Sequence, residues 1–147
     1  MSKCRNMSDL EKYPSRCTEY QERISSEEQK LKHVAINVDH NKVRQYHVDG
    51  DIYTNKDDMP HADFLVLNQE KKTAYIIELK HGKIEKGLEQ LFSTEADFKK
   101  CLCEHTVFLR LVYASATHSV MNMPSVKRLR KAHKNLQIKS KILEEKI

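Results

Sequence analysis

Residues 73–80 read TAYIIELK, and this stretch decides the predicted fold. It is an apolar run with the length and composition of a buried strand, and it ends in a glutamate and a lysine two residues apart. Successive side chains of a strand point to opposite faces of the sheet, so Glu78 and Lys80 share one face and Leu79 takes the other. The sequence therefore predicts a carboxylate beside an ammonium group at the end of a core strand.

A second strand-like run, ADFLVL at residues 62–67, precedes this strand and carries Asp63 near its start. The five turn-permissive residues at 68–72 separate the two runs, and this spacing favours an antiparallel hairpin. Such pairing would bring Asp63 to the end of the sheet where Glu78 lies. We therefore expect two carboxylates and a lysine on one small patch.

The segments after this hairpin predict a helical crossover to a parallel strand. From residue 83 to residue 98 the apolar side chains recur at helical spacing, which predicts an amphipathic helix that packs on the sheet. The run TVFLRLVYA at 106–114 is nearly all apolar, so it predicts a central strand parallel to the strand that ends at Leu79.

The two ends of the chain are expected to flank this core. Residues 1–32 are polar and predict a helical N-terminal segment, and residues 33–38 and 43–48 predict two strands of a meander. Residues 115–147 predict a helix at about 125–134, followed by a short edge strand whose lysines discourage further pairing.

The composition fits one α/β domain with a bias toward anionic partners. At 147 residues the chain is long enough to bury a core, and no repeat or Gly/Pro-rich linker divides it. We therefore expect a single domain with its core over residues 33–114. There are 26 Lys and Arg against 21 Asp and Glu, a net charge of +5, which allows nucleic acid as a partner.

The sequence gives no sign of secretion, membrane insertion or a zinc site. No apolar stretch approaches the roughly 18 residues of a membrane span. The four cysteines lack a CxxC pair; they are Cys4, Cys17, Cys101 and Cys103. We expect reduced thiols, no membrane partner and a cytoplasmic location.

Two acids and a lysine at a strand end suit metal-assisted phosphodiester hydrolysis. A divalent cation held by oxygen ligands polarises a phosphoryl oxygen and supplies a hydroxide-like nucleophile near neutral pH. Asp63 and Glu78 provide such oxygens, and Lys80 can offset the negative charge that builds in the transition state.

Asp63, then Glu78-Leu79-Lys80 with an adjoining helix, resembles the PD-(D/E)xK, or restriction-endonuclease-like, nuclease superfamily. The resemblance covers about residues 43–114 and implies a mixed β-sheet flanked by helices. It implies Mg²⁺ or Mn²⁺ as cofactor, bound by Asp63, Glu78 and the backbone carbonyl of Leu79. It also implies DNA as substrate, with Lys80 acting in catalysis beside the two acids.

Further features of the family have counterparts here. Gln90, within IEKGLEQL, resembles a helical glutamine that orients DNA or the catalytic lysine in some members. Some members carry an acid on their first helix, for which the sequence offers four undistinguished candidates, Glu19, Glu22, Glu27 and Glu28. The chain departs from the family name because Pro60 is not adjacent to Asp63. In HVDGD, Asp49 either adds a metal ligand or belongs to a turn, and its Asp-Gly dipeptide favours the turn.

Two other groups of residues accompany the motif. Among the histidines, His61 and His81 are the two worth testing, because they lie beside the motif residues in sequence. The C-terminal basic run is expected to contact phosphates with little sequence readout, although basic helix faces are often only solvated. Its members are Lys127, Arg128, Arg130, Lys131 and Lys134.

The sequence therefore predicts a metal-dependent nuclease that acts on DNA. A homodimer is an attractive expectation, since one active site cuts one strand and a two-fold pair can cut both. One alternative is a catalytically inactive module of the same fold that binds nucleic acid or a protein partner. Another is a regulatory or interaction protein in which the pair of Glu78 and Lys80 is structural. Substrate form, whether duplex, branched or single-stranded, is left open.

Overall fold

A computed structural model describes residues 4–55, 59–115 and 122–147. In chain order the elements are α1 (Met7–Glu11), β1 (Arg23–Glu28), β2 (Leu31–Ile36), β3 (Val43–His47), the helical turn η1 (Val48–Ile52), β4 (Phe64–Asn68), β5 (Thr73–Lys80), α2 (Ile84–Asp97), β6 (Thr106–Tyr113), α4 (Pro124–Ala132), β7 (Leu136–Ser140) and β8 (Ile142–Lys146). The expected mixed α/β architecture is confirmed.

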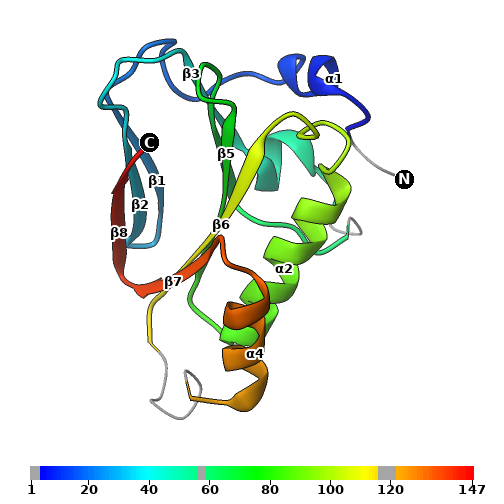
Figure 1. Ribbon diagram of the computed structural model, residues 1–147, viewed down its shortest axis with the longest axis vertical. Coiled ribbons are helices and arrows are strands. Elements are labelled where there is room, and N and C mark those ends of the chain that lie inside the picture. Colours follow the sequence, from blue (N-terminus) through cyan, green and yellow to red (C-terminus); the bar gives the residue numbers. More distant parts are fainter. Residues whose placement is uncertain (1–3, 56–58, 116–121) are drawn as a thin grey trace.

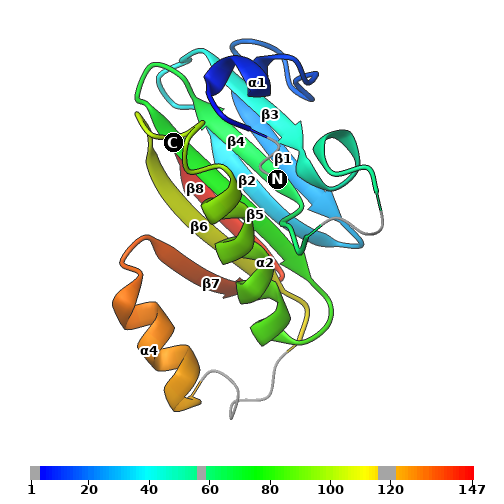
Figure 2. The same cartoon turned by 90° about the vertical axis from the view of Figure 1, so that its right-hand side faces the viewer.

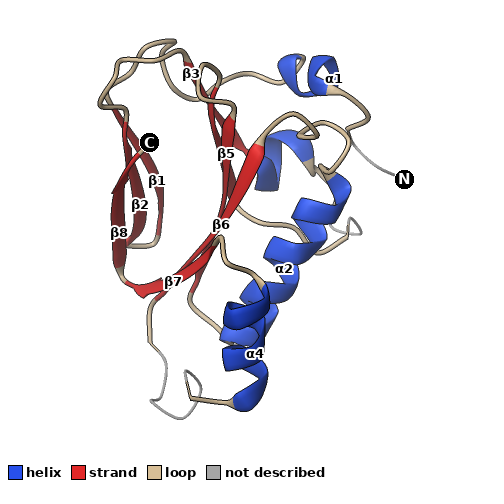
Figure 3. Ribbon diagram, viewed as in Figure 1, coloured by secondary structure: helices blue, strands red, loops and turns tan. Residues whose placement is uncertain are grey.

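The elements form three layers. A five-stranded sheet in the order β3-β4-β5-β6-β7 lies in the middle, and a three-stranded sheet in the order β1-β2-β8 covers one of its faces. The helices lie on the other face (Figures 1 and 3). The central sheet is therefore buried on both sides, which explains why β5 and β6 read as nearly continuous apolar runs.

The centre of the sheet follows the predicted pattern. β4 and β5 pair as an antiparallel hairpin, β5 and β6 pair in parallel, and α2 makes the crossover between them. The alternation along β5 separates two cores: Tyr75, Ile77 and Leu79 pack against the three-stranded sheet, whereas Ala74 and Ile76 pack on the helical side. Glu78 and Lys80 alternate in step with Ala74 and Ile76, so they lie on the helical side of the sheet and share one face, as predicted.

The prediction of a helical segment over residues 1–32 is wrong for most of that range. Within residues 4–32, the part of this range that the structure describes, the one α-helix is the short α1, and the strand β1 pairs antiparallel with β2. Gln29 and Lys30 close this hairpin with φ values of 47° and 71°, the backbone of a tight two-residue turn. The sequence of β1 shows no clear alternation of apolar and polar residues, because only Ile24 and Ser26 of this strand point into the core and one of the two is a serine.

The meander predicted for residues 33–38 and 43–48 is also wrong. Both segments contain a strand, but β2 belongs to the three-stranded sheet and β3 pairs with β4 in the other. The edge strand β7 was predicted, whereas β8, which pairs in parallel with β2, was not. Lys141, with φ of 65°, joins β7 to β8; its amide donates to the Tyr113 carbonyl and its carbonyl accepts from the Lys32 amide. One residue thus carries the chain from one sheet to the other.

Arg110 interrupts the apolar run of β6 and ties the two sheets together. Its guanidinium donates to both carboxylate oxygens of Glu145 on β8, at 2.8 and 3.0 Å. Nε2 of the fully buried His33 on β2 lies 2.7 Å from the same carboxylate. The charged residue within the strand is therefore paired across the interface between the sheets.

The expectation of four reduced thiols is wrong for one pair. Cys4 and Cys101 form a disulfide whose Cα atoms are 5.7 Å apart, within the usual range for such a bond, while Cys17 and Cys103 are free. The bond ties the N-terminal segment to the loop after α2. Among the described residues no helix is long and apolar enough to cross a membrane.

Candidate active site

Asp63 stands at the end of the sheet where β4 begins. Its amide donates at 3.0 Å to the carbonyl of Ile77, the residue of β5 that is the register partner of Phe64. Its Oδ2 accepts a hydrogen bond of 2.9 Å from the amide of Leu79. The amide and carbonyl of a strand residue face the same neighbouring strand, so the Leu79 carbonyl lies on the side of Asp63 as well.

Glu78 is the most deeply buried carboxyl group of the site. The residue is 2% exposed, and its Oε1 is a buried atom without a hydrogen-bond partner. Burial is the main cause that raises its pKa to about 10, followed by the negative charge of Asp63 and a hydrogen bond between the two carboxyl groups. Lys80 opposes this shift, with its Nζ 4.0 Å from Glu78 Oε2. The protein thus holds two acids together at an electrostatic cost.

Lys80 is held by the glutamine that the sequence singled out. Its Nζ donates to Gln90 Oε1 at 2.8 Å, and Gln90 Nε2 donates to the His61 carbonyl at 3.1 Å. The absence of a side chain at Gly87 lets α2 approach, because a Cβ there would meet Lys80 Cγ at 3.3 Å and Leu111 Cδ1 at 2.7 Å. Gln90 therefore positions the ammonium group from the first half of α2.

A third acid joins the group from the other sheet. Burial, then the negative charge of Asp63 and a hydrogen bond with it, raises the pKa of Glu28 at the end of β1, and the charge of Asp49 adds to this shift. Two rival glutamates are occupied elsewhere, because Glu19 pairs with Lys42 and Glu27 with Lys32. Glu28 is thus the candidate whose carboxyl group the structure brings to Asp63. The sequence carried no signal for this choice, since it indicated a helix where β1 forms.

The HVDGD segment forms a turn, as its Asp-Gly dipeptide indicated. Gly50 has φ of 126°, a conformation that favours glycine. Asp51 forms a bidentate ion pair with Arg16, whose Nε and Nη2 each donate to one carboxylate oxygen. Asp49 Oδ1 lies 2.8 Å from Nε2 of His61, whose ring stacks on Tyr53. His61 thus supports the site through its carbonyl and through Asp49, whereas His81 is exposed.

The donor atoms of this patch fit a hard divalent cation. The described residues hold no group of three or more His, Cys, Asp or Glu side chains already arranged as a metal centre. However, Glu78 keeps a buried oxygen without a partner, and Asp63 raises the pKa of both neighbouring glutamates. Carboxylate and carbonyl oxygens are the ligands that Mg²⁺ prefers, and a cation among them would remove the repulsion.

Among the described residues, no hydrogen bond or ion pair joins the basic residues of the C-terminal run to this patch. Val126 anchors α4 in the helical core, and the basic side chains, Lys127, Arg128, Arg130, Lys131 and Lys134, are all exposed. Within the described part of the chain none of them forms an ion pair. Figure 2 shows α4 on the same side of the sheet as α2.

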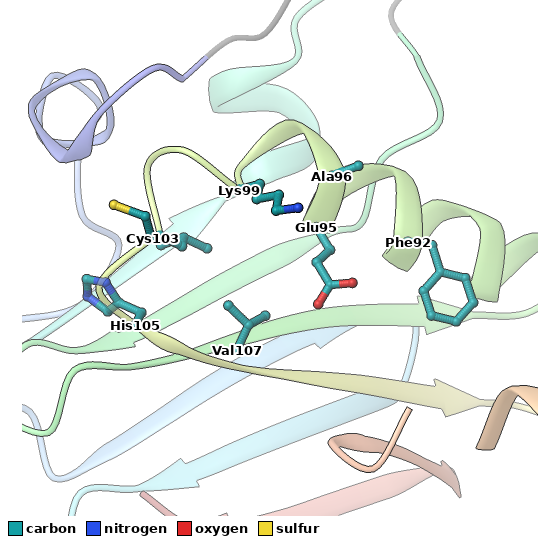
Figure 4. A pocket seen from close by; sticks show the side chains of 8 residues that line it. Phe92, Glu95, Ala96, Lys99, Cys103, His105 and Val107 are labelled. Carbon is teal, nitrogen blue, oxygen red and sulfur yellow. The ribbon is translucent and has the colours of Figure 1, made fainter. Parts of the chain in front are cut away.

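One cavity lies away from the carboxyl groups. It measures about 670 Å³ and lies between the second half of α2 and the start of β6, with Phe92, Glu95, Lys99 and His105 in its wall (Figure 4). Lys80 and Gln90, by contrast, meet at the end of β5 and the first half of α2. The cavity and the candidate site are therefore separate features.

Neither the family models nor the curated proteins nor the solved structures compared with this chain include a match. Functional inference therefore rests on the residues and their geometry.

Proposed function

We propose that this chain is a metal-dependent nuclease of the restriction-endonuclease-like type, which hydrolyses phosphodiester bonds in DNA. One observation carries the proposal: Glu78, buried with an unpartnered oxygen, lies against Asp63 and 4.0 Å from the Lys80 ammonium. A structural ion pair at a strand end would instead be solvent-exposed or fully hydrogen-bonded. Burying two interacting acids costs stability, and such costs concentrate at functional sites.

The residues that would hold the cation are Asp63, Glu78, the backbone carbonyl of Leu79 and, from β1, Glu28. A bound Mg²⁺ or Mn²⁺ supplies a polarised phosphoryl oxygen and a water of lowered pKa. The hydrogen bond from the Leu79 amide fixes one oxygen of Asp63 and leaves the other to bind. Glu78 holds a proton at neutral pH because its pKa is raised, and it must release that proton to act as a ligand.

Lys80 supplies the positive charge of the reaction. Gln90 holds one of its three N–H donors, and the others remain for a phosphoryl oxygen or the attacking water. A donor fixed in advance contributes more to the transition state than one that must be ordered, and such a donor is typically worth roughly 2.7–4 kcal/mol. Gln90 acts here as a positioning residue.

The exposed cations of α4 support nucleic acid as the substrate. They form no ion pair within the described residues, so no carboxylate there competes with phosphate for them. Contacts of this kind give affinity that falls steeply with salt. Replacing Arg128 and Lys131 by Gln should therefore weaken DNA binding and flatten its salt dependence.

The deciding experiment is cleavage of linear, supercoiled, single-stranded and four-way-junction DNA with Mg²⁺, with Mn²⁺ or with EDTA. Wild type should cut only with metal, and Glu78→Gln and Lys80→Met should each lose cleavage. Glu85→Gln, an exposed glutamate at the start of α2, is the matched control and should cut like wild type. If well-folded wild type cuts nothing, the chain is instead an inactive module that binds nucleic acid or a protein.

A further inference from the structure

A groove of about 470 Å³ runs beside the carboxyl groups, between the strands at the edges of the two sheets. Its wall is formed by Ser25, Glu27 and Glu28 from β1, Gln45 and His47 from β3, and Phe64 from the start of β4. Gln45 ties the two strands together, because its Nε2 donates to the Ser25 carbonyl and to Ser26 Oγ, both at 2.9 Å. The groove is therefore a built feature of the stacked sheets.

The groove is continuous with the candidate active site. Glu28 lines it, and the same carboxyl group interacts with Asp63. Phe64, on the opposite wall, is the residue next to Asp63 in the chain. A phosphate bound at Asp63 would therefore lie near Glu28, at the border of this groove.

Two stacked rings stand in the wall of the groove. His47 and Phe64 are register partners across β3 and β4, and their ring centroids are 4.8 Å apart with an interplanar angle of 27°. Both residues are only partly buried. Aromatic faces of this kind are where nucleobases stack in proteins that bind single strands.

The charges in the groove select a base over a phosphate. Glu28 contributes a carboxyl group that repels a phosphodiester backbone, whereas the carboxylate of Glu27 beside it is paired with Lys32. The cation at the rim, Arg16, is already engaged by both carboxylate oxygens of Asp51. A nucleobase is neutral, and its amino groups can donate hydrogen bonds to carboxylate and hydroxyl oxygens such as those of Glu27 and Ser25.

We propose that this groove binds one unpaired base next to the scissile phosphate, so that the substrate is single-stranded or contains unpaired nucleotides. The inference rests on the proposed nuclease function, because that function places a phosphate at Asp63. A base within a duplex is stacked and paired, and it enters such a groove only after extrusion from the helix. The groove volume of about 470 Å³ falls in the range of sites that hold small ligands.

The test uses oligonucleotides that carry 2-aminopurine, whose fluorescence is quenched on stacking, with Mg²⁺ present. Lys80→Met serves as the parent protein, because it keeps all the carboxyl groups and should not cut. We expect the single strand to bind at least tenfold more tightly than its duplex, with quenching. Adding Phe64→Leu or His47→Leu should weaken single-strand binding by roughly 5- to 150-fold, the effect of losing one base stack.

The matched control is Phe108→Leu, which removes a partly buried ring that stacks on Tyr75 away from the groove. Phe64→Tyr, which keeps the ring, should bind like the parent. Equal affinity for duplex and single strand, unchanged binding by both leucine variants, or no binding of either strand would each overturn the groove assignment.

Cleavage by the wild type separates this inference from the nuclease proposal. Metal-dependent cutting of duplex and single strand at equal rates, unaffected by Phe64→Leu, would keep the nuclease and remove the groove. Single-strand binding with quenching, but without any cleavage, would keep the base-binding groove and remove the catalysis.

Discussion

The amide of Leu79 donates a hydrogen bond of 2.9 Å to the carboxylate of Asp63, and this bond joins the two acidic strands of the site. It holds Asp63 beside Glu78 even though burial and their like charges oppose the pair. Backbone geometry, fixed by the antiparallel pairing of β4 with β5, thus maintains an arrangement that the side chains alone would not adopt.

Two substitutions at Asp63 separate its structural role from its chemical role. Asp63→Asn keeps an oxygen that can accept from the Leu79 amide, so stability should be unchanged or higher while cleavage falls at least 100-fold. Asp63→Ala leaves that buried amide unpaired and should lower the free energy of unfolding by about 1–3 kcal/mol. Urea unfolding and cleavage rates check both. Equal stability of the two variants would show that the hydrogen bond does not hold the site.

Glu78→Gln should stabilise the protein, and the gain should grow with pH. The folded-state pKa of Glu78 is about 10, above its ordinary value of 4.5, so between these values the folded state binds one more proton than the unfolded state. Wild-type stability from this group is therefore full below about pH 4.5 and is lost as pH rises toward 10. Glutamine does not ionise, so it makes no pH-dependent contribution to the stability.

We expect Glu78→Gln to gain roughly 1–3 kcal/mol at pH 7 and little at pH 5, because each pH unit in this window contributes up to about 1.4 kcal/mol. Urea unfolding at pH 5, 7 and 9 measures this, with Glu85→Gln on the surface of α2 as the control. A gain that stays constant over this range would contradict the raised pKa.

Gly87→Ala should displace Lys80 without unfolding the protein. The added Cβ would meet Leu111 Cδ1 at 2.7 Å and Lys80 Cγ at 3.3 Å, so the helix or the lysine must shift. Alanine favours a helix over glycine by up to about 1 kcal/mol, which offsets part of the strain. We expect cleavage to fall about tenfold with a smaller change in melting temperature. Gly82→Ala, whose Cβ would meet Lys80 Cε at an ordinary 3.7 Å, should retain activity.

The centre of the fold and most of the motif could be predicted because their signals are local. β5 is predicted from eight consecutive residues, α2 from the helical spacing of its apolar side chains, and the hairpin of β4 and β5 from the short turn between them. Once β4 and β5 pair, the positions of Asp63, Glu78 and Lys80 follow from strand geometry. The contact of Gln90 with Lys80 follows once α2 packs on the sheet with this face.

The three-stranded sheet and Glu28 could not be predicted because they depend on distant partners. β1 has an exposed face of Arg, Ser and Glu, so its sequence resembles that of a solvated helix. β2 pairs with β8, from the other end of the chain, and no local pattern encodes that choice. Glu28 reaches Asp63 only after the two sheets have stacked. The position of Glu28 in the site therefore depends on the tertiary structure and not on the local sequence.

The ion pair between Arg110 and Glu145 should anchor β8, and its contribution should disappear in acid. Burial alone would raise the pKa of Glu145, but hydrogen bonds from His33 and Arg110 outweigh it, so the pKa is lowered below its ordinary value of 4.5. A lowered carboxyl pKa stabilises the folded state above about pH 4.5, and this stability is lost as pH falls through the folded-state value. Glu145→Gln should therefore cost about 3 kcal/mol at pH 7, since it leaves the charge of Arg110, whose side chain is 10% exposed, without its carboxylate partner.

The matched control lies one residue away on the same strand. Glu144 pairs with Arg23 at the surface, where the two side chains are 50% and 62% exposed, so Glu144→Gln should cost less than about 0.5 kcal/mol. Urea unfolding at pH 7 and at pH 3 compares the variants, and the penalty of Glu145→Gln should shrink at pH 3, where the wild-type carboxyl is also being protonated. Equal penalties for the two glutamates at pH 7 would show that β8 is held by its apolar contacts, such as Leu143, and not by this buried ion pair.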